Sequence, residues 1–127
     1  MSSKVDLSDF TFLILVRLDS IARLENILIC TDFLNRNLST NIRVLECASY
    51  NNGFLKKLLN KSIGYSFVED KDIILYRTKL LNKLTRTVRT QFISIWDTDV
   101  IIPIEQIIQS VILLRKREVD FVYPYEN

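Results

Sequence analysis

The fold-deciding stretch of the chain is Phe10-Thr11-Phe12-Leu13-Ile14-Leu15-Val16-Arg17-Leu18-Asp19-Ser20. Its first seven residues form an apolar run that is rich in side chains favoured in strands. Such a run predicts a strand that is buried on both faces, as strands of a parallel sheet are. Asp19 or Ser20 can then cap a helix that begins directly after this strand.

Strand and helix patterns alternate along the rest of the chain. The helix after Ser20 has apolar side chains at a spacing near the helical period, and we expect it to end around Arg36-Asn37. Further strands are predicted at 41–47, 64–68, 91–96 and 120–125, and further helices at 54–60, 70–84 and 103–116. The helix over 70–84 would turn inward Ile73, Ile74, Leu80, Leu81 and Leu84. This alternation predicts the α/β class, with a mostly parallel sheet, flanking helices and right-handed connections.

Composition bounds the kinds of function that the chain can have. Its 127 residues fit one domain, and 48% hydrophobic residues allow a packed core. The net charge of +2 comes from dispersed basic residues, so we expect no nucleic-acid partner. The chain has no histidine, which excludes Ser-His-Asp and Cys-His catalysis and the usual zinc sites. Any bound metal would be a hard cation held by carboxylate oxygens.

The sequence also has no glycine-rich phosphate-binding loop and no membrane-spanning segment or signal peptide that can be recognised. The two glycines, Gly53 and Gly64, are not spaced for a dinucleotide fingerprint or a P-loop. The apolar run at 10–16 is too short to cross a membrane and no signal peptide precedes it, so we expect a cytoplasmic protein, with peripheral membrane contact left open. Cys30 and Cys47 have apolar neighbours and are expected to be buried free thiols.

Polar side chains at the carboxyl ends of the strands are the candidates for chemistry. Open parallel sheets bind ligands there, and the chain places Arg17 and Asp19 after the first strand, Glu46 in the second, and Asp97 and Asp99 after the fourth. A strand order of 3-2-1-4 would bring Arg17, Asp19 and the two later acids into one crevice. Two carboxylates one residue apart can approach one Mn²⁺ or Mg²⁺ ion. The competing interpretation is a turn and helix cap before Pro103.

Four segments, in order and with matching spacing, resemble the N-terminal portion of GT-A glycosyltransferases. The likeness is to the family 2 and β-1,4-galactosyltransferase groups, and it covers nearly the whole chain. The segments are Phe12-Leu13-Ile14-Leu15-Val16-Arg17-Leu18-Asp19-Ser20, Asn41-Ile42-Arg43-Val44-Leu45-Glu46, Tyr76-Arg77-Thr78-Lys79-Leu80-Leu81-Asn82 and Phe92-Ile93-Ser94-Ile95-Trp96-Asp97-Thr98-Asp99-Val100-Ile101-Ile102-Pro103. The third is similar to the group's Arg-Ala-Lys-Leu-Leu-Asn helix, and the fourth to its apolar strand, Asp-x-Asp and proline.

The resemblance implies a role for each matching position. Asp97 would lie near the ribose and the metal, and Asp99 would be the direct ligand of Mn²⁺ or Mg²⁺. Arg17 and Arg77 would contact the nucleotide or its phosphates. Asp19 and Glu46 would line the base and ribose pocket. The ligand would be a nucleotide-diphosphate sugar, with UDP as the expected nucleotide, and the acceptor would be a hydroxyl of a glycan or of a lipid-linked saccharide.

The chain also departs from the family pattern. Its first loop lacks the proline and second arginine of galactosyltransferases, so the donor sugar is not predicted. The family's catalytic base and acceptor site lie in a C-terminal half that this chain does not contain, so we expect the N-terminal part of a longer enzyme, truncated, which binds nucleotide without transferring sugar. A sheet edge exposed by truncation could support a homodimer.

Two other classes of protein stay open as alternatives. A nucleotidyltransferase also uses carboxylate-bound Mg²⁺ on such a sheet, but it would normally carry a Gly-rich loop after the first strand. A non-catalytic α/β module of the flavodoxin or receiver type would act through a protein partner, but a receiver would need a lysine after the fifth strand. Independently of the class of protein, the competing interpretation of Arg77 is a solvated helix arginine, and that of Glu46 is a strand-end acid without a ligand.

Overall fold

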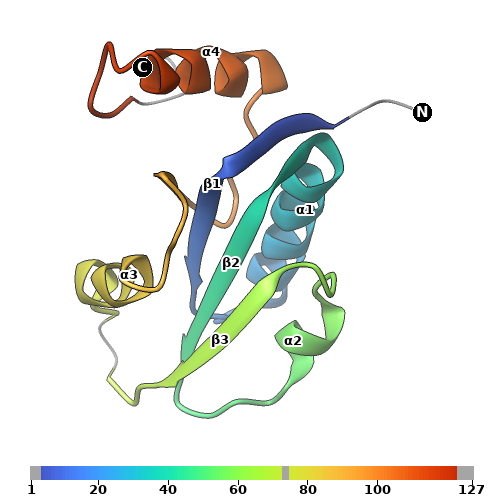
Figure 1. Ribbon diagram of the computed structural model, residues 1–127. Coiled ribbons are helices and arrows are strands. Elements are labelled where there is room, and N and C mark those ends of the chain that lie inside the picture. The colour runs from blue at the N-terminus through green and yellow to red at the C-terminus, as the bar shows by residue number, and fades with distance from the viewer. Residues whose placement is uncertain (1–3, 73–74, 123–127) are drawn as a thin grey trace.

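The computed structural model describes residues 4–72 and 75–122 of the chain. Strands and helices alternate along it, as the sequence predicts (Figure 1). The elements are β1 (Val5–Val16), α1 (Ile21–Asn37), β2 (Leu38–Ala48), α2 (Phe54–Leu58), β3 (Gly64–Glu69), α3 (Arg77–Thr85), β4 (Phe92–Trp96) and α4 (Ile104–Arg115). Among the described helices, none is both long enough and apolar enough to cross a membrane.

The four strands form one sheet in the order β3-β2-β1-β4, and every neighbouring pair is parallel. This order is the one that the sequence analysis considered. The central strand β1 has neighbours on both sides, so that Phe12 lies beside Ile42 of β2 and Ser94 of β4. The result is a Rossmann-like α/β arrangement, in which the carboxyl ends of all four strands share one edge of the sheet.

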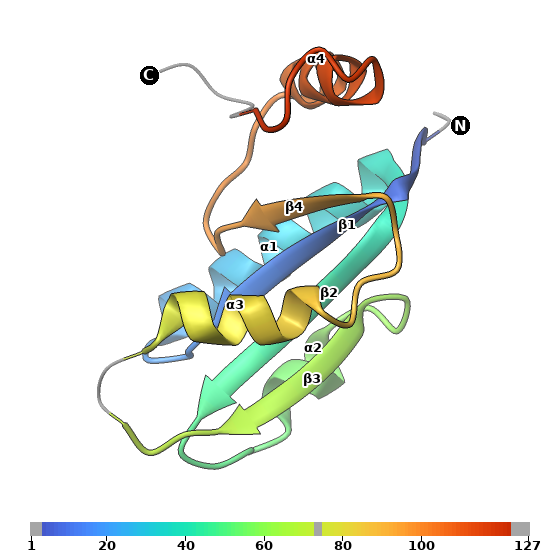
Figure 2. The same ribbon diagram turned by 60° about the vertical axis from the view of Figure 1, so that its left-hand side comes forward.

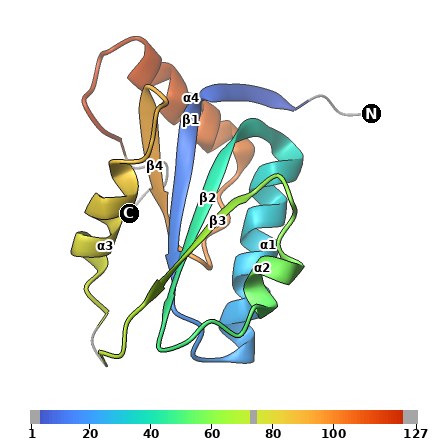
Figure 3. The same cartoon turned by 60° about the horizontal axis from the view of Figure 1, so that its bottom comes forward.

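Helices cover both faces of the sheet. Figure 2 shows α3 in front of the sheet and α1 behind it, and Figure 3 shows α2 beside α1. Phe12, Ile14 and Val16 pack on the side of α1, α2 and α4, while Leu13 and Leu15 pack on the side of α3. Because successive side chains of a strand point to opposite faces, a strand covered on both sides must be apolar at every position. The prediction that residues 10–16 form a strand buried on both faces is confirmed.

The first helix begins and ends where the sequence predicts. The Ser20 hydroxyl accepts the backbone N–H of Arg23 at 3.2 Å and so satisfies one of the free donors of the first turn. The helix buries Ile27, Cys30 and Leu34 against the sheet and ends at Asn37.

Both central strands begin earlier than predicted. β1 starts at Val5 and β2 at Leu38, and their register is irregular between Leu7 and Thr11. The polar residues at these ends conceal the strand pattern in the sequence. α4 holds the extension of β1 in place, because Arg115 donates to the backbone carbonyl of Asp6 at 2.9 Å and to the carboxylate of Asp9 at 2.7 Å.

Two predicted elements are corrected by the structure. The helix predicted over 70–84 begins only at Arg77, because the N–H of Asp70 continues the sheet by donating to Ala48 and its carboxylate accepts from Asp72. The described part of the strand predicted at 120–125 is not a strand. There the chain leaves α4 through Arg117 at a φ of 57°, a left-handed residue that redirects it. Positions 73–74 and 123–125 lie outside the described residues.

Candidate functional site at the carboxyl edge

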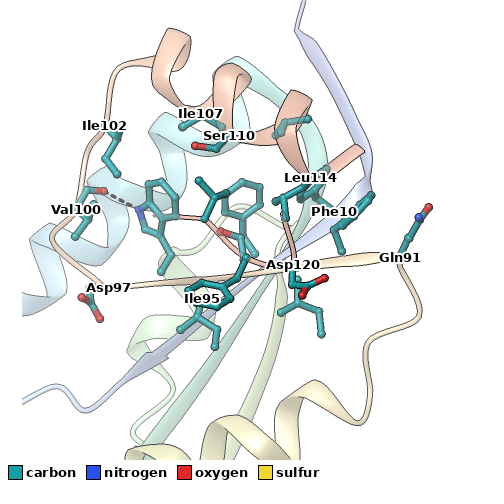
Figure 4. Close-up of a pocket in the computed structure, with 18 of the residues that line it drawn as sticks. Phe10, Gln91, Ile95, Asp97, Val100, Ile102, Ile107, Ser110, Leu114 and Asp120 are labelled. Atoms are coloured by element: carbon teal, nitrogen blue, oxygen red, sulfur yellow. Dashed lines mark hydrogen bonds between the residues drawn. The ribbon is translucent and has the colours of Figure 1, made fainter. Parts of the chain in front are cut away.

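The Asp97-Thr98-Asp99 segment forms a turn directly after β4. Trp96 is 5% exposed, and its indole N–H donates to the carbonyl of Val100 at 2.9 Å (dashed line in Figure 4). The Cys30 thiol of α1 donates to the same carbonyl at 3.4 Å and lies 3.7 Å from the carbonyl of Asp97. The backbone on both sides of the acidic pair is therefore anchored, while the two carboxylates stay exposed to solvent.

The buried Cys30 thiol is close enough to both acids of the turn to be affected by their charges. Burial raises the pKa of the Cys30 thiol to about 11, and the negative charges of Asp99 and Asp97 add to this effect. A thiolate would be repelled by both carboxylates, so the charge of each acid acts on the buried side of the turn. The two acids thus form one local region of negative potential at the end of β4.

One pair of predicted site residues is brought together. Arg77, the first residue of α3, approaches Asp97 with 2.7 Å between its Nη2 and the carboxylate Oδ1. The two side chains are 43% and 60% exposed, so solvent and ligands can reach both. This pair joins α3 to the end of β4 across twenty positions of sequence.

Arg17 does not join that pair but faces the ends of β2 and β3. Its Nε donates to the carbonyl of Cys47 at 3.3 Å, and its Nη1 donates to the carbonyl of Asp72 at 2.8 Å. Its Nη2 lies 3.8 Å from the carboxylate of Asp70. The guanidinium thereby holds the loops after two strands together at the carboxyl edge.

Asp70 is a strand-end acid that the sequence analysis missed. It follows β3 directly, as Asp97 follows β4, and such a position was the signal used for the other candidates. The prediction of a helix from 70 onward concealed it. Asp70 pairs with Arg17 as Asp97 pairs with Arg77, so each of these strand-end acids faces an arginine.

Asp19 and Glu46, the other two predicted site residues, lie apart from the Arg77–Asp97 pair. Asp19 is exposed and pairs with Arg23 one turn into α1 at 3.4 Å. Glu46 is 3% exposed and accepts the phenolic O–H of Tyr65 at 2.6 Å. Burial, followed by the contact with Glu46, raises the pKa of Tyr65. Glu46 shares its strand face with Val44, so it points to the α1 side of the sheet, away from α3.

An open cavity of about 800 Å³ runs along β4, between that strand, α4 and residues 120–122 (Figure 4). Its walls are mostly apolar. They include Phe10, Phe12, Ile95, Trp96, Ile107, Val111, Leu114 and Phe121. Arg77 and Asp97 also line it, which places the exposed ion pair at the margin of an apolar cavity.

The donor set at the turn fits a hard divalent cation that is shared with a phosphate ligand. Asp97 and Asp99 offer exposed carboxylate oxygens, and Asp97 uses only its Oδ1 toward Arg77. In the part of the chain that the structure describes, no three acidic or cysteine side chains gather closely enough to enclose a metal. Mg²⁺ and Mn²⁺ do not require such an enclosure, because they commonly take one or two carboxylates, with waters and substrate phosphates completing the shell.

Comparison with known proteins adds no family to this description. Neither a scan of the chain against protein-family models nor a search of curated proteins finds a match.

Proposed function

We propose that this chain is a GT-A nucleotide-sugar-binding domain of a glycosyltransferase and that it binds a UDP-sugar together with Mn²⁺ or Mg²⁺. The observation that carries the proposal is the contact between Arg77 and Asp97, at 2.7 Å, beside the second acid of the turn. These residues come from two of the four segments on which the family resemblance depends. Supporting it is their position at the carboxyl edge of a parallel sheet, where such folds bind nucleotides.

Each residue has a distinct task in this proposal. Asp97 and Asp99 hold the cation, which supplies positive charge to neutralise a departing diphosphate. Arg77 donates hydrogen bonds to phosphate oxygens, for which its planar guanidinium is well suited. Trp96 and Cys30 keep the acidic turn in one conformation, so that less ordering is needed when the ligand binds.

The acceptor belongs to the same proposal. A hydroxyl of a glycan or of a lipid-linked saccharide would attack the anomeric carbon of the donor. That step needs a base that accepts the hydroxyl proton, and the resemblance assigns no residue of the four matching segments to that role. The experiment below therefore tests nucleotide binding.

Calorimetric titration tests the proposal. The protein is titrated with UDP and UDP-sugars, once with Mn²⁺ and once with a chelator, and with ATP and flavin mononucleotide for comparison. We expect UDP binding that requires Mn²⁺ and is lost in Asp99→Ala. Arg77→Gln should weaken UDP binding while leaving Mn²⁺ binding, measured by electron paramagnetic resonance, nearly unchanged.

The matched control is Asp32→Ala, which removes an exposed carboxylate on α1 that pairs with Arg36 at 3.0 Å. This control should bind UDP and Mn²⁺ like the wild type. A folded protein that binds none of these nucleotides would refute the proposal for this chain. Binding of flavin without a metal requirement would instead support the flavodoxin-type alternative.

A further inference from the structure

The short helix α2 has one buried and one exposed apolar side. Leu55 and Leu59 are 0% and 6% exposed and anchor the segment in the core. Phe54 and Leu58 lie one turn apart on α2 and are 62% and 55% exposed, and Tyr50 in the preceding loop is 70% exposed. Scattered exposed apolar residues are ordinary, but three such large side chains within nine residues indicate an interaction surface.

The same segment carries only positive charge. Lys56, Lys57 and Lys61 are all exposed, and residues 49–64 contain no aspartate or glutamate. Within the described residues these three lysines make no ion pair. Tyr50, Phe54, Leu58 and the three lysines are called the α2 surface below.

The charges and apolar groups of the α2 surface together favour one kind of partner. We propose that the α2 surface docks the protein on an anionic lipid bilayer. Lysines attract lipid phosphates and carboxylates, while aromatic and aliphatic side chains enter the boundary between headgroups and acyl chains. A nucleic-acid backbone would use the lysines but would leave Phe54 and Leu58 in water.

Helix α3 provides an internal comparison. Its exposed Lys79 and Lys83 lie one turn apart on the side that faces away from the buried Leu80 and Leu84, and Tyr76 before the helix is the neighbouring exposed large side chain, at 50%. It lies on the opposite side of the sheet from α2 (Figure 3). Lys79 and Lys83 thus compare two lysines beside one exposed aromatic ring with the lysines of the α2 surface, which lie beside Tyr50, Phe54 and Leu58.

The α2 surface lies in the connection between β2 and β3. The connection from β2 to α2, which contains Tyr50, leaves the edge of the sheet to which the strands point (Figure 1). That edge also carries Asp97. The α2 surface runs from this edge, at Tyr50, toward the start of β3, which Lys61 precedes. The docking itself depends on none of the proposed nucleotide-binding residues, so it can be tested and can fail separately from the proposed function.

Sedimentation with vesicles measures the interaction. Phosphatidylcholine vesicles are compared with vesicles that contain 30% phosphatidylserine, at low and at high salt, with circular dichroism to verify the fold of each variant. We expect binding to the anionic vesicles that weakens with salt. One lysine near an anionic surface contributes roughly fivefold to partitioning, so K56Q/K57Q should bind about 30-fold more weakly. F54S/L58S should bind at least about tenfold more weakly.

Matched control variants distinguish docking through the α2 surface from nonspecific electrostatic attraction between the protein and the vesicles. K79Q/K83Q removes the same charge from α3, and Ile29→Ser removes an apolar side chain of similar exposure, 56%, from α1, where Glu25 and Asp32 are close in the helix. Both controls should bind within about twofold of the wild type. Equal losses in K79Q/K83Q and K56Q/K57Q would overturn the proposal. Unchanged vesicle binding of F54S/L58S would also overturn it, as would a folded wild type that does not bind anionic vesicles. A third contrary result would be displacement of the protein from the vesicles by single-stranded RNA that carries the same total charge as the anionic lipid.

Discussion

Replacing Trp96 by phenylalanine tests how the acidic turn is held. The substitution removes the indole N–H that donates to Val100, and a hydrogen bond of this kind contributes about 1 kcal/mol net. The carbonyl of Val100 keeps the Cys30 thiol at 3.4 Å and is not left without a donor. The smaller ring buries roughly 40 Å² less apolar surface and loses part of its edge contact with Phe12, which adds about 1 kcal/mol. The free energy of unfolding should fall by about 2 kcal/mol.

Urea unfolding followed by far-ultraviolet circular dichroism measures this change. Trp96 is the only tryptophan of the chain, so its fluorescence disappears with the substitution. The slope of the unfolding free energy against urea should stay the same while the midpoint falls. Because the carbonyl of Val100 then keeps only the weaker thiol donor of Cys30 among its described side-chain partners, Mn²⁺-dependent UDP affinity should also fall, by about three- to tenfold.

The control is Ile63→Val, which shortens a buried side chain between α2 and β3 and is expected to lower stability by about 1 kcal/mol. It should leave UDP affinity unchanged, since it does not contact the turn. A loss of stability below about 0.5 kcal/mol in Trp96→Phe would show that the indole does not anchor the turn. An equal loss of affinity in both variants would show that affinity follows overall stability.

Two further predictions concern pH. The hydrogen bond from Arg115 lowers the pKa of Asp9, so the carboxylate stabilises the fold above its ordinary pKa of about 3.9 and loses this effect as the pH falls. In urea unfolding, Asp9→Asn should therefore be less stable than the wild type by about 1 kcal/mol at pH 7, and this difference should shrink as the pH falls below about 3.9; a difference that does not shrink with falling pH would contradict this explanation. The pKa of Cys30 is raised to about 11, so the folded state favours the protonated thiol and loses stability as the pH rises from about 8.5 toward 11. The stability of Cys30→Ser should decline less between pH 7 and pH 10, and parallel declines in the two proteins would contradict the assignment.

The sequence by itself determined the class of the fold. The apolar run of β1 required cover on both faces, and the Ser20 cap fixed the start of α1. These features are local, because each depends on residues within one strand or one turn. The order of strands considered in advance is also the observed one.

Only the tertiary structure decided which polar side chains meet. Arg17 and Arg77 are both basic residues near strand ends, yet one turns toward Asp70 and the other toward Asp97. Glu46 points into the α1 side of the sheet because one step along a strand reverses the face. The late start of α3 followed from the pairing of Asp70 with the end of β2, which is far away in sequence. Local sequence patterns specify the helices and strands. Which charged side chains form ion pairs depends on tertiary packing, because packing determines which groups lie within a few ångströms of each other.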